Sequence, residues 1–171
     1  MRIEAGAATV PGVIEPARFA RDQSLVTGVL ALTRLPRLAE ILFDHEGSVR
    51  YSVEGYRTAR GEPALHMSLT ADLGARCQRC LERIPLHLDI ARDIILLAQV
   101  RALEQADDDD EDTDAIPHTN TLDLLDLIEE EVVLSLPMVP RHPDEGCSAR
   151  PAAPSGERDS PFSVLAGLKT H

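Results

Sequence analysis

The stretch that decides the fold is Leu65-His66-Met67-Ser68-Leu69-Thr70-Ala71-Asp72-Leu73, in which every second residue is apolar. This period of two is typical of a β-strand with one buried face and one face in water. The same alternation occurs before it at 49–53 and after it at 84–90, and turn-forming sequences separate the three runs. The pattern therefore predicts an antiparallel meander over residues 49–98.

Residues outside the meander predict one further strand and two helices. Segment 24–32 is expected to be a strand, and segment 36–43 a short helix, because Pro is tolerated in a first helical turn. Asn120 can cap a longer helix that starts at Thr121, with Asp123 in its first turn and the glutamates 129–131 on its wet side. The predicted fold class is α+β: an antiparallel β-meander with a Cys-x-x-Cys knuckle at a hairpin turn, packed by one main C-terminal helix and a short N-terminal helix.

Length and composition indicate one domain with appendages. The chain has 171 residues, of which 43% are hydrophobic, and this suffices for one core built mainly from aliphatic side chains. We expect an N-terminal extension at 1–20 and a single α+β domain at 21–147 with an acidic mobile loop at 105–118. A mostly disordered tail at 148–171 is expected to end in a Pro-Phe motif.

The formal net charge of -12 comes from one part of the chain. Residues 105–136 carry twelve acidic side chains and no basic ones, whereas 1–104 and 137–171 are each balanced. A neutral body with an acidic belt can still present a local basic face, so charge alone does not exclude nucleic acid as a partner.

The sequence predicts a soluble, cytoplasmic protein. Glu4 stands where a signal peptide would have its apolar segment, and the most apolar stretches fall far below the roughly 20 residues needed to span a bilayer. Cysteines in such a chain are expected to be reduced thiols or metal ligands.

A Cys-x-x-Cys pair lies between two strand-like runs, at Cys77 and Cys80. A thioredoxin-type pair instead sits where a strand gives way to a helix, so the hairpin context favours a metal knuckle. The remaining cysteine, Cys147, follows His142 in one short loop, and together the four residues would complete a Cys₃His set for a structural Zn²⁺. The alternative, a surface imidazole and an incidental thiol, stays open on spacing alone.

Two further groups are candidates for binding partners. Arg76, Arg79 and Arg83 form a positive cluster around the knuckle that could contact RNA phosphates, or could simply keep the turn soluble. The second group could bind a basic protein and consists of Asp107, Asp108, Asp109, Asp110, Glu130, Glu131 and Phe162. Phe162 is the one apolar member, and its C-terminal segment could instead dock on its own domain. No catalytic residue is predicted, because the sequence contains no Gly-rich phosphate loop, nucleophile elbow or acid–base pair at helical spacing.

With these motifs assembled, the sequence resembles the YceD family, named for accumulation of large-subunit ribosomal RNA in bacteria and plastids. The resemblance covers about residues 20–171 and rests on an ordered set: Cys77-Gln78-Arg79-Cys80-Leu81-Glu82, the acidic loop, the helix 123–136 with Glu130-Glu131 and its terminal Leu136-Pro137, Pro140-x-His142, Cys147, and Pro161-Phe162-Ser163-Val164-Leu165. Ser160 departs from the family's usual Asn before Pro-Phe.

The resemblance implies a non-catalytic role in accumulation of 23S ribosomal RNA and hence in biogenesis of the large (50S) ribosomal subunit. The partner would be ribosomal RNA, a large-subunit ribosomal protein or an assembly intermediate. Two alternatives stay beside it: an acidic module that holds a basic ribosomal protein, and a thiol-dependent enzyme, which a lowered pKa at Cys77 would favour.

Overall fold

The computed structural model describes residues 2–3, 12–97, 113–117, 120–143 and 147. In this part of the chain six strands form one sheet in the order β1-β3-β4-β5-β6-β7. The strands are β1 (Arg2–Ile3), β3 (Leu25–Ala31), β4 (Ser48–Arg57), β5 (Pro63–Arg76), β6 (Arg83–Leu97) and β7 (Thr113–Pro117). Strands β3 to β6 are antiparallel neighbours, as the sequence predicts, whereas β1 and β7 add to the two edges in parallel.

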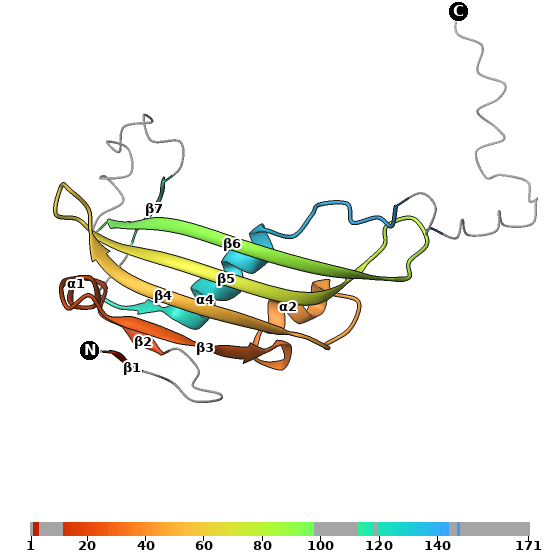
Figure 1. Cartoon of the computed structure of the whole chain (residues 1–171), viewed down its shortest axis with the longest axis horizontal. Coiled ribbons are helices and arrows are strands. Elements are labelled where there is room, and N and C mark those ends of the chain that lie inside the picture. The colour runs from red at the N-terminus through yellow and green to blue at the C-terminus, as the bar shows by residue number, and fades with distance from the viewer. Residues whose placement is uncertain (1, 4–11, 98–112, 118–119, 144–146, 148–171) are drawn as a thin grey trace, which may run out of the picture.

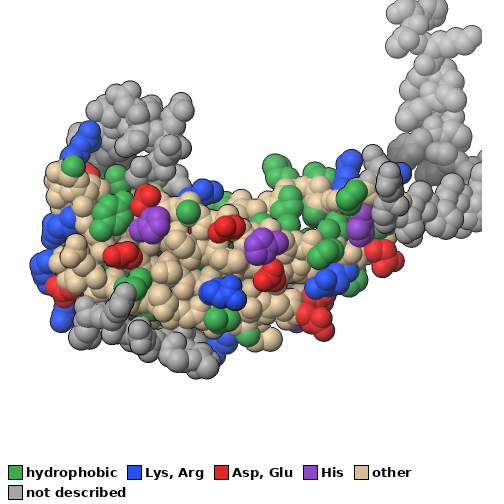
Figure 2. Space-filling view, in the orientation of Figure 1, with side chains coloured by type: hydrophobic (Ala, Val, Ile, Leu, Met, Phe, Trp, Pro, Cys, Tyr) green, Lys and Arg blue, Asp and Glu red, His purple; other side chains and the backbone are tan. Residues whose placement is uncertain are grey.

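One face of the sheet is buried because the alternating apolar residues all point to the same side. Along β4 the buried positions recur at every second residue, and β5 continues the pattern with Leu65, Met67 and Leu69 at 0–1% exposure. Helix α4 (Leu124–Leu134) runs across this face (Figure 1) and buries Leu124, Ile128 and Val132 against it. The opposite face carries Asp, His and Arg side chains in water (Figure 2).

Two shorter helices and a second pair of strands complete the fold. Helix α1 (Pro16–Arg21) and helix α2 (Pro36–Ile41) both begin at a proline, whose missing N–H costs nothing in a first turn. A 3₁₀ turn, η1 (Leu32–Arg34), precedes α2, and β2 (Val13–Ile14) pairs with β8 (Leu122–Asp123). The predicted fold class, α+β with one main C-terminal helix, is confirmed.

The start of α4 corrects the predicted cap. The helix begins at Leu124 rather than at Thr121, and its N-cap is Asp123 rather than Asn120. The Asp123 carboxylate accepts hydrogen bonds from the backbone N–H groups of Leu125, at 2.9 Å, and Asp126, at 3.4 Å. Residues 122–123 are extended because they pair with β2, so the helix cannot start earlier.

The prediction of a wet glutamate face on α4 is wrong at two of its three positions. Glu129 is 4% exposed; its carboxylate accepts hydrogen bonds from the backbone N–H of Leu38, at 3.0 Å, and from Arg37 Nε, at 3.1 Å. Glu131 is 9% exposed and lies 3.7 Å from Arg92 Nε. Glu129 is buried because α2 packs on α4 and presents the Leu38 N–H in its first turn, and Glu131 faces Arg92 of β6.

Two of the predicted segments contain residues that pair in the sheet or pack in the core. Part of the expected extension at 1–20 belongs to the domain, because β1 pairs with β3 and Phe19, at 7% exposure, joins the core. Within the expected loop at 105–118, residues 113–117 form β7. The other residues of that loop lie outside the described residues, as does the predicted tail at 148–171. Among the described helices, none has the length and apolar character to cross a membrane.

Candidate metal centre

The Cys-x-x-Cys knuckle is the turn between β5 and β6, as the alternation predicts. Cys77 follows the last residue of β5, its backbone N–H donates to Glu82 O at 2.9 Å, and its carbonyl accepts from the Leu81 N–H at 3.0 Å. Leu81 has a φ of 67°, the left-handed conformation that lets the chain reverse after Cys80. The turn thus presents both sulfurs on the same side.

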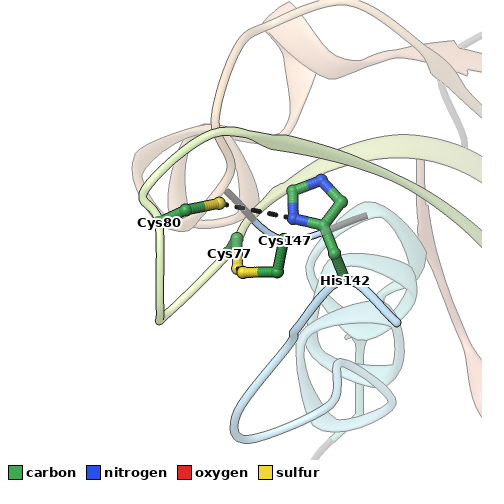
Figure 3. Close-up of side chains that lie close together, drawn as sticks. All are labelled: Cys77, Cys80, His142 and Cys147. Atoms are coloured by element: carbon green, nitrogen blue, oxygen red, sulfur yellow. Dashed lines mark hydrogen bonds between the residues drawn. The ribbon is translucent and has the colours of Figure 1, made fainter. Parts of the chain in front are cut away.

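The loop that follows α4 returns to the knuckle and adds the remaining donors. The Gln78 N–H donates to Pro140 O at 2.9 Å, and this bond fixes the start of the loop against the turn. Figure 3 shows His142 from this loop pointing at Cys80, while the Cys147 and Cys77 side chains meet beside it. The structure therefore brings together the four predicted ligands Cys77, Cys80, His142 and Cys147.

The four donor atoms lie at separations that suit a tetrahedral ion. They are all within 4.8 Å of one another; Cys77 Sγ is 3.8 Å from Cys147 Sγ, and Cys80 Sγ is 3.4 Å from His142 Nδ1. With Zn–S of about 2.3 Å and Zn–N of about 2.0 Å, a regular Cys₃His tetrahedron has edges of about 3.8 Å between sulfurs and about 3.5 Å between sulfur and nitrogen. These two of the six donor–donor separations agree with that geometry, and the other four lie within 4.8 Å.

The histidine is held in the orientation that a ligand needs. His142 Nε2 lies 3.0 Å from the backbone carbonyl oxygen of Arg83, which can only accept a hydrogen bond. Nε2 must then carry a proton, and in the neutral imidazole this leaves the lone pair on Nδ1, the atom 3.4 Å from Cys80 Sγ. Such an outer hydrogen bond is the usual support of a metal-ligating histidine.

The thiols are unlike ordinary cysteines. Burial raises the pKa of Cys77, but hydrogen bonds to its sulfur, chiefly from the backbone of Cys80, His142 and Arg79, outweigh burial and lower that pKa to about 5. Burial and the neighbouring sulfurs raise the pKa of Cys147 to about 11. A lowered thiol pKa would also suit a nucleophile, yet Cys77 is 0% exposed and no substrate can reach its sulfur without rearrangement. A buried thiolate is better placed to bind a cation.

The three predicted RNA-binding arginines differ in their surroundings. Arg83 Nε lies 2.6 Å from Asp44 Oδ2, so its charge is already paired within the chain. The guanidinium of Arg76 lies 5.4 Å from the centre of the Phe43 ring and is otherwise at the surface. Arg79 is exposed at the tip of the turn. The Asp44–Arg83 pair gave no sequence signal, because the two residues are 39 positions apart in regions without a shared motif.

The predicted acidic partner surface is only partly described. Glu130 is exposed and Glu131 is buried beside Arg92, while Asp107 to Asp110 and Phe162 lie outside the described residues. Two further carboxylates, Asp123 and Asp126, join Glu130 in a groove between α4 and β7. Periodicity could have found Asp126, which shares one side of α4 with Glu130, and the capping preference of Asp could have found Asp123.

The fold and this donor set define a class of protein: a twisted antiparallel sheet crossed by one helix, with a Cys₃His cluster that joins a hairpin knuckle to the loop after the helix. The chain belongs to the YceD family, whose family model, described as "Large ribosomal RNA subunit accumulation protein YceD", matches residues 65–169. That range contains all four clustered residues. The resemblance seen in the sequence is thereby confirmed.

A curated relative agrees along nearly the whole chain. The "Large ribosomal RNA subunit accumulation protein YceD" of Haemophilus influenzae is 26% identical over 170 residues, covering 94% of this chain and 96% of the relative. No solved structure gives a significant match.

Proposed function

We propose that the protein is a non-catalytic, cytoplasmic factor that supports accumulation of 23S ribosomal RNA and thereby biogenesis of the large ribosomal subunit. The observation that carries the proposal is the family match over residues 65–169, together with a relative named for the same role. The test is to delete the gene and measure the ratio of 23S to 16S ribosomal RNA and the 50S peak in a sucrose gradient. A ratio and a peak that do not change on deletion would refute the proposal.

Within that role the Cys₃His cluster holds a structural Zn²⁺. The tetrahedral edges, the fixed tautomer of His142 and the low exposure of Cys77 and Cys147 support this assignment. Four protein ligands fill a tetrahedron, so the ion would tie the knuckle to the loop rather than activate water. Protein purified without chelator should contain one zinc per chain and three thiols that react only after the metal is removed. Metal-free protein with three reactive thiols would exclude the assignment.

The exposed arginines of the knuckle are the proposed contacts to RNA phosphates. Arg79 and Arg76 are exposed at the turn that the metal would stiffen, and Arg83 forms an ion pair with Asp44. Arg79→Ala should weaken binding to 23S transcripts and reduce the salt slope by about 0.7–0.9, the value for one lost phosphate contact. Arg60→Ala removes an equally exposed arginine from the opposite end of the meander and serves as the matched control. Equal slopes for both variants and the wild type would remove direct RNA contact from the proposal.

The groove between α4 and β7 favours a second candidate, an acidic module that holds a basic ribosomal protein. Asp123, Asp126, Glu130 and Glu131 line it together with one basic residue, Arg92, and apolar residues of α4 and β7. Asp126 is paired with Arg37 at 2.7 Å and Asp123 caps α4, so Glu130 is the proposed contact for a Lys- or Arg-rich segment with an apolar anchor. Individual large-subunit proteins should be titrated at low and high salt. If a partner binds through the groove, the charge reversal Glu130→Lys should weaken its binding. The control Glu40→Lys reverses the charge of an exposed glutamate outside the groove and should leave the affinity unchanged. If the two reversals act alike, the groove is not the site.

A further inference from the structure

An apolar groove lies beside the candidate metal centre. It is formed where the end of α2, the ends of β5 and β6, and the segment after α4 meet, and its apolar lining includes Ile41, Leu42, Ala75, Leu86, Leu136 and Met138. Met138 is 97% exposed and Ile41 is 53% exposed. Hydrophobic side chains are visible at this end of the molecule in Figure 2.

The groove lies where helix α4, which covers the buried face of the sheet, ends. Under α4 the aliphatic residues of the sheet are almost inaccessible, as Leu65 and Ile94 show at 0% exposure. The helix ends at Leu134, and beyond it the sheet residue Leu86 is only half-buried. The sheet therefore keeps accessible apolar side chains at this end, where no described helix covers them.

The course of the chain places its own C-terminal segment within reach of the groove. Cys147 Sγ is 3.8 Å from Cys77 Sγ, and Gln78, the next residue along from Cys77, lines the groove together with Pro140. Fourteen residues then separate Cys147 from Phe162. Fully extended, a stretch of this length reaches about 50 Å, so a segment at its end can reach a groove that adjoins the residue next to Cys77.

The chemistry of that segment matches the groove. Residues 161–168 read Pro-Phe-Ser-Val-Leu-Ala-Gly-Leu, with one of the chain's three phenylalanines and three further aliphatic side chains, Val164, Leu165 and Leu168. The residues that flank the segment carry balanced charge, with Glu157 and Asp159 beside Arg158 and Lys169, so the pairing is argued from apolar contacts.

We propose that residues 161–168 dock into the groove of their own chain and cover the exposed end of the sheet beside the metal centre. The docked segment would extend the hydrophobic core past the end of α4, with Phe162 as its anchor. This inference is independent of the RNA or protein partner proposed above.

The absence of tryptophan from the chain makes a direct test possible. Phe162→Trp introduces a single reporter into the full-length protein. Docking predicts a blue-shifted emission and a several-fold lower acrylamide quenching constant than for a free peptide of residues 158–171 with the same substitution. Met138→Asp, at a side chain that is 97% exposed, should return both values to those of the peptide. Val13→Asp, at an exposed apolar position outside the groove, should leave them unchanged.

Hydrogen exchange gives a second readout that needs no tryptophan. In the chain without substitutions, the amides of 161–168 should be protected, and Met138→Asp should remove the protection. Peptide-like quenching together with unprotected amides would overturn the proposal. Protection that disappears on dilution, with dimers seen by sedimentation, would also overturn it, because the occupant would then belong to a second copy.

Discussion

Glu129 offers a sharp test of how the helices are joined, because its carboxylate is 4% exposed and accepts from a backbone N–H of the neighbouring helix. Glu129→Ala removes the hydrogen-bond acceptor of the Leu38 N–H, and Leu38 is 0% exposed. A buried donor left without a partner costs about 1–3 kcal/mol. Glu129→Gln keeps an oxygen for that N–H and should lose less.

The measurement is equilibrium unfolding in urea, followed by circular dichroism. With a slope of about 2 kcal/mol per molar urea, the midpoint for Glu129→Ala should fall by about 0.5–1.5 M. The neighbouring exposed Glu130 provides the control, and Glu130→Ala should stay within about 0.5 kcal/mol of the wild type. If the two alanine variants unfold at the same urea concentration, the buried hydrogen bond does not stabilise the fold and the reasoning is refuted.

Three further outcomes follow from the structure. Gly47→Ala should destabilise the fold by about 2 kcal/mol or more in thermal unfolding, because φ is +129° and a Cβ would stand 2.2 Å from a backbone oxygen. Gly61→Ala, with a φ of +83° and no described atom within 4 Å of its Cβ, should cost about 1 kcal/mol; equal losses would show that the close contact is relieved. The hydrogen bond from Arg83 lowers the pKa of Asp44, so its stabilisation is present above the unfolded-state pKa and is lost as pH falls through the folded pKa. In Asp44→Asn the free energy of unfolding should therefore fall less steeply as the pH is lowered. An unchanged pH dependence would contradict the pairing. His142→Ala should lower the zinc affinity more than tenfold in a competition titration, since about 10–16 kcal/mol is shared among four ligands; an unchanged affinity would place the histidine outside the site.

The sheet could be predicted from sequence because its signal is local. Alternation such as Leu65, Met67 and Leu69 is set by the pleat of the strand itself, and the intervening turns are short. The Cys₃His cluster could be predicted for a different reason: the chain has three cysteines, so their chemical type restricts the possible partners even across 70 positions.

What could not be predicted depends on which elements pack together. Glu129 looks like a surface residue until α2 is placed against its helix, and Asp44 has no visible link to Arg83 before β5 and β6 are folded. Phe19 gives no periodic pattern, because α1 is only six residues long. In each of these three cases the environment of the residue is set by tertiary contacts and not by its local sequence.

The 70-residue separation between Cys77 and Cys147 has a consequence for the order of events during synthesis. The N-terminal part of a chain leaves the ribosome first, so β3 to β6 can pair before His142 and Cys147 have been translated. A metal ion bound by Cys77 and Cys80 alone has half of its ligands at that time. The proposed centre would close only when the last ligand emerges, and a nascent chain truncated before that point would bind the ion weakly. Full affinity for the metal would therefore require a domain that has been translated through Cys147.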